Sequence, residues 1–165
     1  MSARLWYPQL DVYDAIRRMC VLLQYFDEPP GAERLYISDF FLANPPLLHR
    51  TSMTAEVRKS FMELKIPRPD KVFVSFPSSL LLFHKMEPIQ KEAINALKGR
   101  GLLSLDDYKL GKVVLTGKTE ELFSVDVMSS EDEQGLCTFL ATKFSSQSQI
   151  GNQELRRKTG LRRSF

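Results

Sequence analysis

Residues 86–103 read MEPIQKEAINALKGRGLL, a pattern typical of one amphipathic helix that ends at a glycine. Ile89 and Leu97 belong to an apolar stripe at helical spacing, which predicts a buried face. Pro88 is expected in the first turn, where the missing N–H of a proline is tolerated. Residues 102–115 then form two short apolar runs around a polar bend, which predicts a β-hairpin. A helix followed directly by a small hairpin is typical of a winged helix-turn-helix.

The same periodicity predicts four further helices, over residues 12–26, 32–43, 55–65 and 131–144. Three N-caps are expected, at Asp11, Thr54 and Ser130. Within the second of these helices, Ser38 and Asp39 are expected near the solvent edge. The helices over 11–26 and 86–100 are expected to pack together as the centre of the molecule.

Residues 122–128 alternate apolar and polar side chains, which predicts a third strand. Residues 71–76 fit either a short strand or a loop, and periodicity does not decide between them. The expected fold class is therefore α+β, a mainly helical winged helix-turn-helix domain with a small antiparallel β-hairpin wing. This domain is expected to span residues 1–149, with a basic C-terminal tail over 150–165.

A chain of 165 residues with 43% hydrophobic side chains suits one domain with a substantial core. The net charge of +3 is terminal, because residues 150–165 carry five basic side chains against one acidic one. No apolar run approaches the roughly 20 residues that span a membrane, and the N-terminus lacks a signal-peptide core. We therefore expect a cytoplasmic protein without membrane contact, with Cys20 and Cys137 as buried free thiols.

The sequence contains no motif for catalysis, metal binding or cofactor binding. Gly117, Lys118 and Thr119 lack the upstream glycine of a phosphate-binding loop. His49 and His84 are isolated from other metal-ligating residues. We therefore expect no enzymatic activity, no metal and no cofactor.

The polar face of the helix over 86–100, together with the hairpin, is the candidate nucleic-acid surface. Lysine and asparagine side chains can reach phosphates and base edges. The candidates are Lys91, Asn95 and Lys98 on the helix, and Lys109, Lys112 and Lys118 on or near the hairpin. The simpler alternative is that they form the ordinary solvated face of a soluble protein.

The C-terminal tail combines two leucines with basic side chains, which favours a partner-binding segment. The expected contact residues are Leu155, Arg156, Arg157, Lys158, Leu161, Arg162 and Arg163. Because the near-neutral body offers these charges no obvious target, an acidic groove on a partner or DNA is expected to bind them. The alternative is a solvated, disordered end. Deletion of residues 154–165 is expected to leave the domain folded.

Four stretches of the chain read YPQLDVYDAIRRMCVLL, RLYISDFFLANPPLL, FHKMEPIQKEAINALKGRGLL and LRRKTGL. In this order they resemble the middle components of bacterial ABC three-component systems, which include the small subunit of Lamassu-type anti-phage complexes. The likeness spans almost the whole chain, and none of the four stretches is a catalytic motif.

The resemblance implies a winged-helix adaptor that is encoded beside an SMC-like ATPase and an effector, often a nuclease. Such a subunit has no activity alone and couples DNA sensing by the ATPase to the effector, with double-stranded DNA as a further contact of the complex. Two other classes of function remain open. They are a free-standing winged-helix transcription regulator that binds its operator as a dimer, and a small enzyme.

Overall fold

The secondary structure of the described residues is helical. A computed structural model describes residues 7–72, 76, 78–122, 129–144 and 152–162, and these ranges contain one isolated antiparallel bridge and no strand. No helix in these ranges is long and apolar enough to cross a membrane. The elements in chain order are η1 (Pro8–Leu10), α1 (Val12–Leu23), α2 (Ala32–Ala43), η2 (Pro45–Arg50), α3 (Ala55–Glu63), η3 (Pro69–Lys71), α4 (Ser79–Gly99), α5 (Leu105–Lys109), α6 (Gly117–Leu122), α8 (Glu131–Phe139), η4 (Leu140–Phe144) and α9 (Asn152–Thr159).

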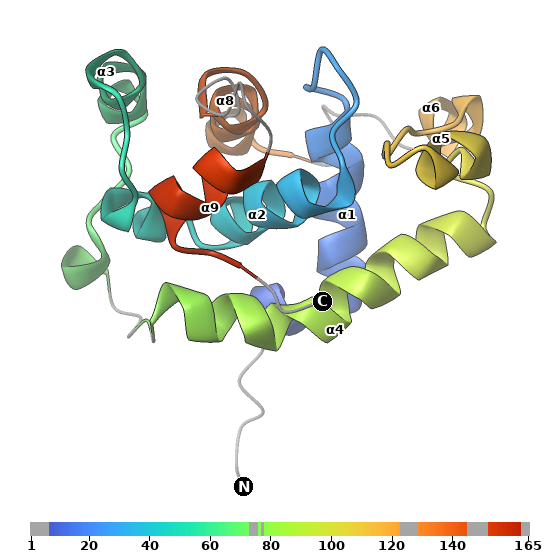
Figure 1. Cartoon of the computed structure of the whole chain (residues 1–165), viewed down its shortest axis with the longest axis horizontal. Coiled ribbons are helices and arrows are strands. Elements are labelled where there is room, and N and C mark those ends of the chain that lie inside the picture. Colours follow the sequence, from blue (N-terminus) through green and yellow to red (C-terminus); the bar gives the residue numbers. More distant parts are fainter. Residues whose placement is uncertain (1–6, 73–75, 77, 123–128, 145–151, 163–165) are drawn as a thin grey trace, which may run out of the picture.

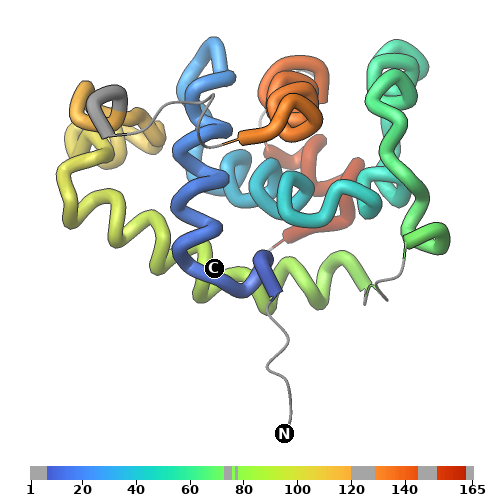
Figure 2. Tube along the Cα trace, turned by 180° about the vertical axis from the view of Figure 1, so that it is seen from behind, coloured from blue at the N-terminus to red at the C-terminus, as the bar shows by residue number. Residues whose placement is uncertain are grey.

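The long helix α4 forms the base of the molecule (Figure 1). Helices α3 and α8 project beyond α2 on the side away from α4, and the α5–α6 pair lies at one edge, beyond the C-terminal end of α4 (Figures 1 and 2). The most extensive contact between two elements joins α1 and α4. The prediction that these two helices pack together is therefore confirmed, although α4 lies at the base of the molecule rather than at its centre.

The three predicted N-caps are confirmed. The side-chain oxygens of Asp11, Thr54 and Ser130 accept hydrogen bonds from the backbone N–H groups of Tyr13, Val57 and Glu133, at 2.8, 3.3 and 3.2 Å. Each bond satisfies a donor that has no partner within its own helix. Local sequence signals therefore set where α1, α3 and α8 begin.

The β-hairpin predicted over residues 102–115 is wrong. Residues Leu105–Lys109 form helix α5 instead, because Ser104 Oγ accepts a hydrogen bond from Asp107 N at 3.3 Å and caps the helix. The flanking apolar runs still meet antiparallel, but only as one isolated bridge. Since the described ranges contain no strand, the α+β winged-helix class is also wrong, and the fold is mainly helical.

Helix α4 begins at Ser79, earlier than predicted, so Pro88 lies inside the helix rather than in its first turn. A proline inside a helix removes a backbone hydrogen bond and bends the helix. Helix α4 indeed bends near its middle in Figures 1 and 2. The strand predicted over 122–128 lies outside the described residues except for Leu122, which ends α6. Residues 71–76 are described in part, and the described ones form no strand.

A continuous series of ring contacts runs through the core. The successive rings belong to Phe83, Phe40, Phe41, Phe144, Phe139, Phe61 and His49, with neighbouring centroids 4.8–5.9 Å apart. Several of these pairs meet edge to face, a geometry that adds to the stabilisation from area burial. The series connects α4, α2, η4, α8, α3 and η2, so these elements share one core.

Candidate interaction surfaces

A buried polar network joins the central helices. The side chains of Arg18 and Asp39 are 2% and 0% exposed, and Arg18 Nε lies 2.7 Å from Asp39 Oδ1. The same guanidinium donates to Asp14 Oδ2 at 2.6 Å, and Gln90 Nε2 donates to Asp39 Oδ2 at 2.9 Å. The prediction that Asp39 lies near the solvent edge is therefore wrong, as it is for Ser38, which is 1% exposed.

The electrostatics of this network suit a structural role. Burial alone lowers the pKa of Arg18, but the charges of Asp39 and Asp14 and their hydrogen bonds outweigh it and raise the pKa. In the same way, burial lowers the pKa of Arg17, but the hydrogen bonds that its guanidinium donates to Glu133 and Asp14 raise the pKa, with a net increase. Arg17 thereby ties α1 to the first turn of α8. Because Arg18 and Asp39 are buried, a substrate has no access to these two charges from solvent.

The two thiols are buried and form no disulfide, as predicted. Burial raises the pKa of Cys20 to about 11. Burial also raises the pKa of Cys137 to about 12, with a further contribution from the charge of Glu133. A thiol with such a pKa is protonated at neutral pH, and only the thiolate is a good nucleophile or metal ligand. Within the described residues, no group of three or more His, Cys, Asp and Glu side chains is placed to hold a metal ion.

The candidate nucleic-acid residues of α4 differ in their surroundings. Lys91 is exposed and pairs with Glu87 at 2.7 Å, and Asn95 is exposed. The ammonium of Lys98 lies 4.1 Å from the centre of the Tyr108 ring, a cation–π contact with α5. Two of the three side chains therefore have partners within the chain.

Without the hairpin, the other three candidates lie on different elements. Lys109 ends α5, Lys112 follows it and Lys118 lies in α6, and all three are exposed. The ammonium of Lys118 lies beside Gly101, since an ideal Cβ on that glycine would be 3.8 Å from Nζ. A cation near the C-terminal end of α4 interacts favourably with the helix dipole. Nucleic-acid contact through these lysines stays a prediction.

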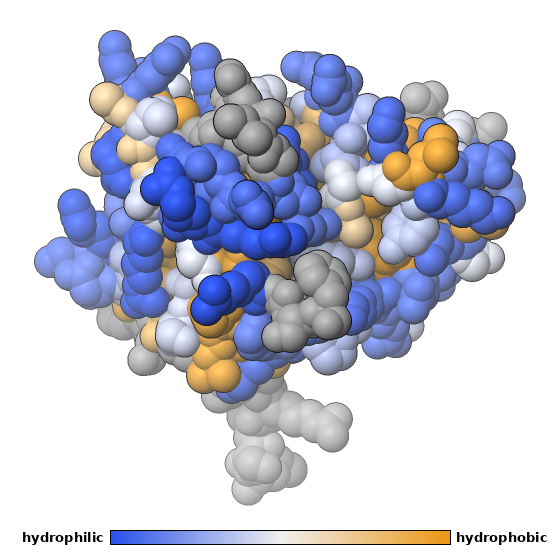
Figure 3. Space-filling model, in the orientation of Figure 1, coloured by the Kyte–Doolittle hydropathy of each residue, from blue (hydrophilic) through white to orange (hydrophobic). Residues whose placement is uncertain are grey.

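The C-terminal segment packs on the body of the chain. Residues Asn152–Thr159 form helix α9, and Leu155 and Leu161 are buried in the same core as the central helices. Arg156 pairs with Glu33 on α2, so the expectation that the tail has no acidic target within the chain is wrong. In Figure 3, strongly hydrophilic residues gather over α9.

The remaining tail residues have local partners. Arg157 pairs with Glu154, and Ser52 N donates to the carbonyl of Lys158 at 2.8 Å. The carbonyl of Arg162 lies 2.8 Å from His84 Nε2 on α4, whereas Arg163 lies outside the described residues. Their role in partner binding stays a prediction, as does the division of the chain at residue 149.

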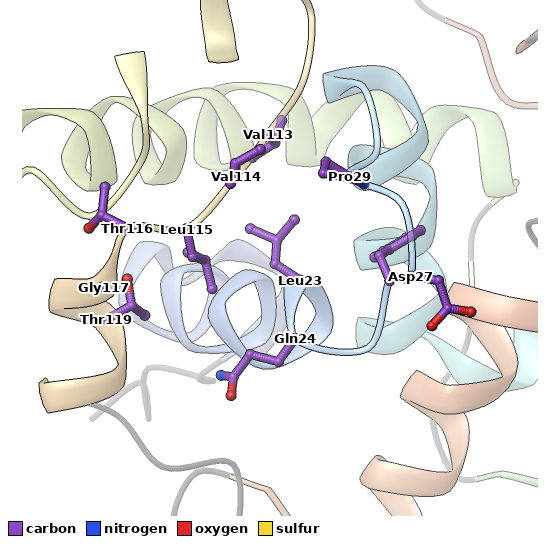
Figure 4. Close-up of a pocket in the computed structure, with 11 residues that line it drawn as sticks. Leu23, Gln24, Asp27, Pro29, Val113, Val114, Leu115, Thr116, Gly117 and Thr119 are labelled. Atoms are coloured by element: carbon purple, nitrogen blue, oxygen red, sulfur yellow. The ribbon is translucent and has the colours of Figure 1, made fainter. Parts of the chain in front are cut away.

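Two of the cavities on the surface have a largely apolar lining. The first, of about 300 Å³, lies between the C-terminal end of α1 and residues 113–117, and Leu23 and Leu115 face each other across it (Figure 4). The second, of about 720 Å³, lies between α3 and α8, and we call it the α3–α8 groove. Its apolar lining consists of Leu42, Pro45, Pro46, Leu64, Ile66, Pro67 and Leu136.

Sequence reasoning missed both the buried network and the α3–α8 groove. A signal for the network is present, because Arg18 falls among the apolar residues Ala15, Met19 and Leu22 of α1, at the spacing of its buried face. The groove has no such signal, since its walls come from segments that are far apart in the sequence.

One family accounts for nearly the whole chain. The family described as ABC-three component (ABC-3C) system Middle Component 5 matches residues 4–164. No curated protein and no solved structure is significantly similar to the chain.

Proposed function

Because the chain belongs to the Middle Component 5 family of ABC-three component systems, we propose that it is a non-catalytic adaptor between an ABC ATPase and an effector. The observation that carries the proposal is the extent of the match, from residue 4 to residue 164. The family implies that the chain interacts with the other components of its three-component system.

The finer parts of the proposal concern the partners. We propose an SMC-like ATPase and an effector nuclease, in a cytoplasmic complex of the Lamassu type that acts against phage or plasmid DNA. The likeness of four stretches in family order supports this assignment. Double-stranded DNA is proposed as a contact of the assembled complex, with the exposed Lys109, Lys112 and Lys118 as candidates on this subunit.

The absence of catalysis is proposed on the chemistry of the described residues. The most buried charged groups, Arg18 and Asp39, are bonded to each other, and both thiols are held protonated. Such groups stabilise a fold and lack the open, solvent-accessible geometry of a nucleophile with its base. A free-standing winged-helix transcription regulator is not proposed, because the argument for it depended on the predicted β-hairpin wing.

Co-purification tests the adaptor proposal. The chain, carrying an affinity tag, is expressed together with the proposed ATPase and effector. Both proteins are expected to elute with it as one complex in size-exclusion chromatography. Elution of the tagged chain alone, while the other two proteins are present and soluble, would contradict the proposal.

A second experiment tests the part of the proposal that concerns DNA. Alanine at Lys109, Lys112 and Lys118 is expected to lower the salt slope of DNA binding by the complex by about three, since each phosphate contact contributes about one unit. The matched control replaces three exposed lysines on other elements, Lys59, Lys71 and Lys85, and is expected to keep the slope. Equal salt slopes for the two triple variants would indicate that another subunit, not this one, contacts the DNA.

A further inference from the structure

The α3–α8 groove is a formed feature of the fold. Pro45, Pro46 and Pro67 contribute to its walls, and a proline fixes its own backbone φ. The carbonyl of Ile66, another lining residue, accepts a hydrogen bond from His49 Nε2 at 2.7 Å. The His49 ring in turn packs on Phe61 in the core. A groove held in this way loses little conformational entropy when a ligand enters it.

Two lining residues are unfavourable for the helix in which they occur, and a third is unfavourable for the turn that follows α3. Gly135 lies inside α8, where an ideal Cβ would be 3.7 Å from Leu64 Cδ2, so alanine would fit and would favour the helix. Glu63 places a negative charge at the C-terminal end of α3, against the helix dipole. Lys65 has a φ of 55°, a region that favours glycine. The stability of the local backbone explains none of these three residues. An open groove explains the small Gly135, and a negatively charged groove explains Glu63.

The charge at the rim is predominantly negative. Glu63 lies on the α3 side, and Glu131 and Asp132 lie on the α8 side, all three exposed. Glu133, also in the lining, pairs with Arg17, and Lys65 is the one cation among the residues that line the groove. Acids in the first turn of α8 complement its dipole, but Glu63 has no such local role. Carboxylates therefore face the groove from both walls above an apolar floor.

We infer that the α3–α8 groove is the docking site for a basic, amphipathic segment of another component of the three-component system. Its apolar side chains would fill the floor at Leu42, Ile66 and Leu136, and its lysines or arginines would meet the carboxylates of the rim. The inference rests on the proposed adaptor function and names the surface through which that function works.

Charge reversal in the groove tests the inference on the complex as it assembles with the ATPase and effector. The variant Glu63→Lys/Asp132→Lys is expected to weaken binding of one component at least tenfold at low salt, with a smaller difference at high salt. The control Glu92→Lys reverses an exposed acid on α4 outside the groove and is expected to change binding less than twofold. Glu63→Lys alone places a favourable charge at the end of α3, so loss of binding by this single variant would not reflect unfolding.

The outcomes separate the inference from the function on which it rests. If the unchanged chain assembles and the groove variants assemble equally well, the groove inference is overturned and the adaptor function stands. If the unchanged chain does not assemble, both are overturned. A photoreactive residue in place of Pro67, at the exposed rim, then identifies the occupant. Cross-linking to a Lys- or Arg-containing segment of a partner component supports the inference, whereas cross-linking to a second copy of this chain, or none in the assembled complex, overturns it.

Discussion

Arg18 on α1 and Asp39 on α2 form an ion pair inside the core, with Arg18 Nε 2.7 Å from Asp39 Oδ1. The pair is extended by Asp14, by the carbonyl of Pro8 and by Gln90 of α4, so four elements meet at two buried charges. Removing charges from water is costly, and the cost is offset here by a nearly complete set of hydrogen bonds. The network thus fixes how α1, α2 and α4 lie against one another.

Breaking this pair is expected to destabilise the chain strongly. Asp39→Ala leaves the Arg18 guanidinium buried beside fewer acceptors, and the free energy of unfolding should fall by about 3–5 kcal/mol. Replacement of both partners, Arg18→Met/Asp39→Leu, should lose much less than the sum of the losses from Arg18→Met alone and Asp39→Leu alone, because no unpaired charge remains. Urea denaturation measures these values. Strictly additive losses would show that the two residues do not act as a pair.

The local part of the fold is predictable because it depends on neighbours in sequence. Asp11, Thr54 and Ser130 cap the helices they were expected to cap, and the 3.6-residue period locates α1, α2, α3 and α8. The error at α5 has a local cause. Two apolar runs around a polar bend fit a hairpin, but Ser104 and Asp107 also have the spacing of a helix cap, and that signal prevails.

The long-range part is not predictable from one sequence. Arg18 pairs with Asp39, which lies 21 residues later in the sequence, and Glu33 pairs with Arg156, which lies 123 residues later. Charged residues occur throughout the chain, and periodicity says which face they occupy without saying which partner they meet. For the same reason the α3–α8 groove, whose walls come from distant segments, has no signature in the sequence.

The thiols predict how stability depends on pH. The folded-state pKa values of Cys20 and Cys137, about 11 and about 12, lie above the ordinary value of 9.0. The folded state therefore keeps both thiols protonated up to a higher pH than the unfolded state does. Their contribution to the free energy of unfolding is complete below pH 9 and is lost as the pH rises through the folded-state pKa values. Between pH 9 and 10 each thiol should lower the free energy of unfolding by about 1 kcal/mol.

Urea denaturation across this pH range measures the effect. The matched control Cys20→Ala/Cys137→Ala lacks both thiols and should lose less stability between pH 9 and 10 than the unchanged chain. Identical pH slopes for the two proteins would contradict the assignment. At pH 8 the native chain is also expected to resist alkylation by iodoacetamide until denaturant is added.

The C-terminal segment is expected to contribute to stability. Leu161 is fully buried, and Leu161→Ala should lower the free energy of unfolding by about 2–5 kcal/mol through lost contacts and the cavity left behind. Deletion of residues 154–165 removes Leu155 as well, and we therefore expect a larger loss than for Leu161→Ala, in contrast to the expectation from sequence. The exposed Arg157 supplies the control, since Arg157→Ala should leave the denaturation midpoint unchanged. A truncated chain as stable as the full one would show that α9 is dispensable for folding.

Lys65 offers a stabilising substitution at the edge of the α3–α8 groove. Lys65 follows the C-terminal end of α3 and has a φ of 55°. Glycine is favoured at such a position, because it has no Cβ to strain against the backbone. Lys65→Gly should therefore raise the free energy of unfolding by up to about 1 kcal/mol, since relief of this strain exceeds the greater entropy of glycine in the unfolded chain. Lys65→Ala serves as the matched control, because it removes the same charged side chain and keeps the Cβ. A gain in thermal midpoint for the glycine variant and not for the alanine variant assigns the effect to the backbone. Equal midpoints would show that the left-handed conformation of Lys65 carries no strain.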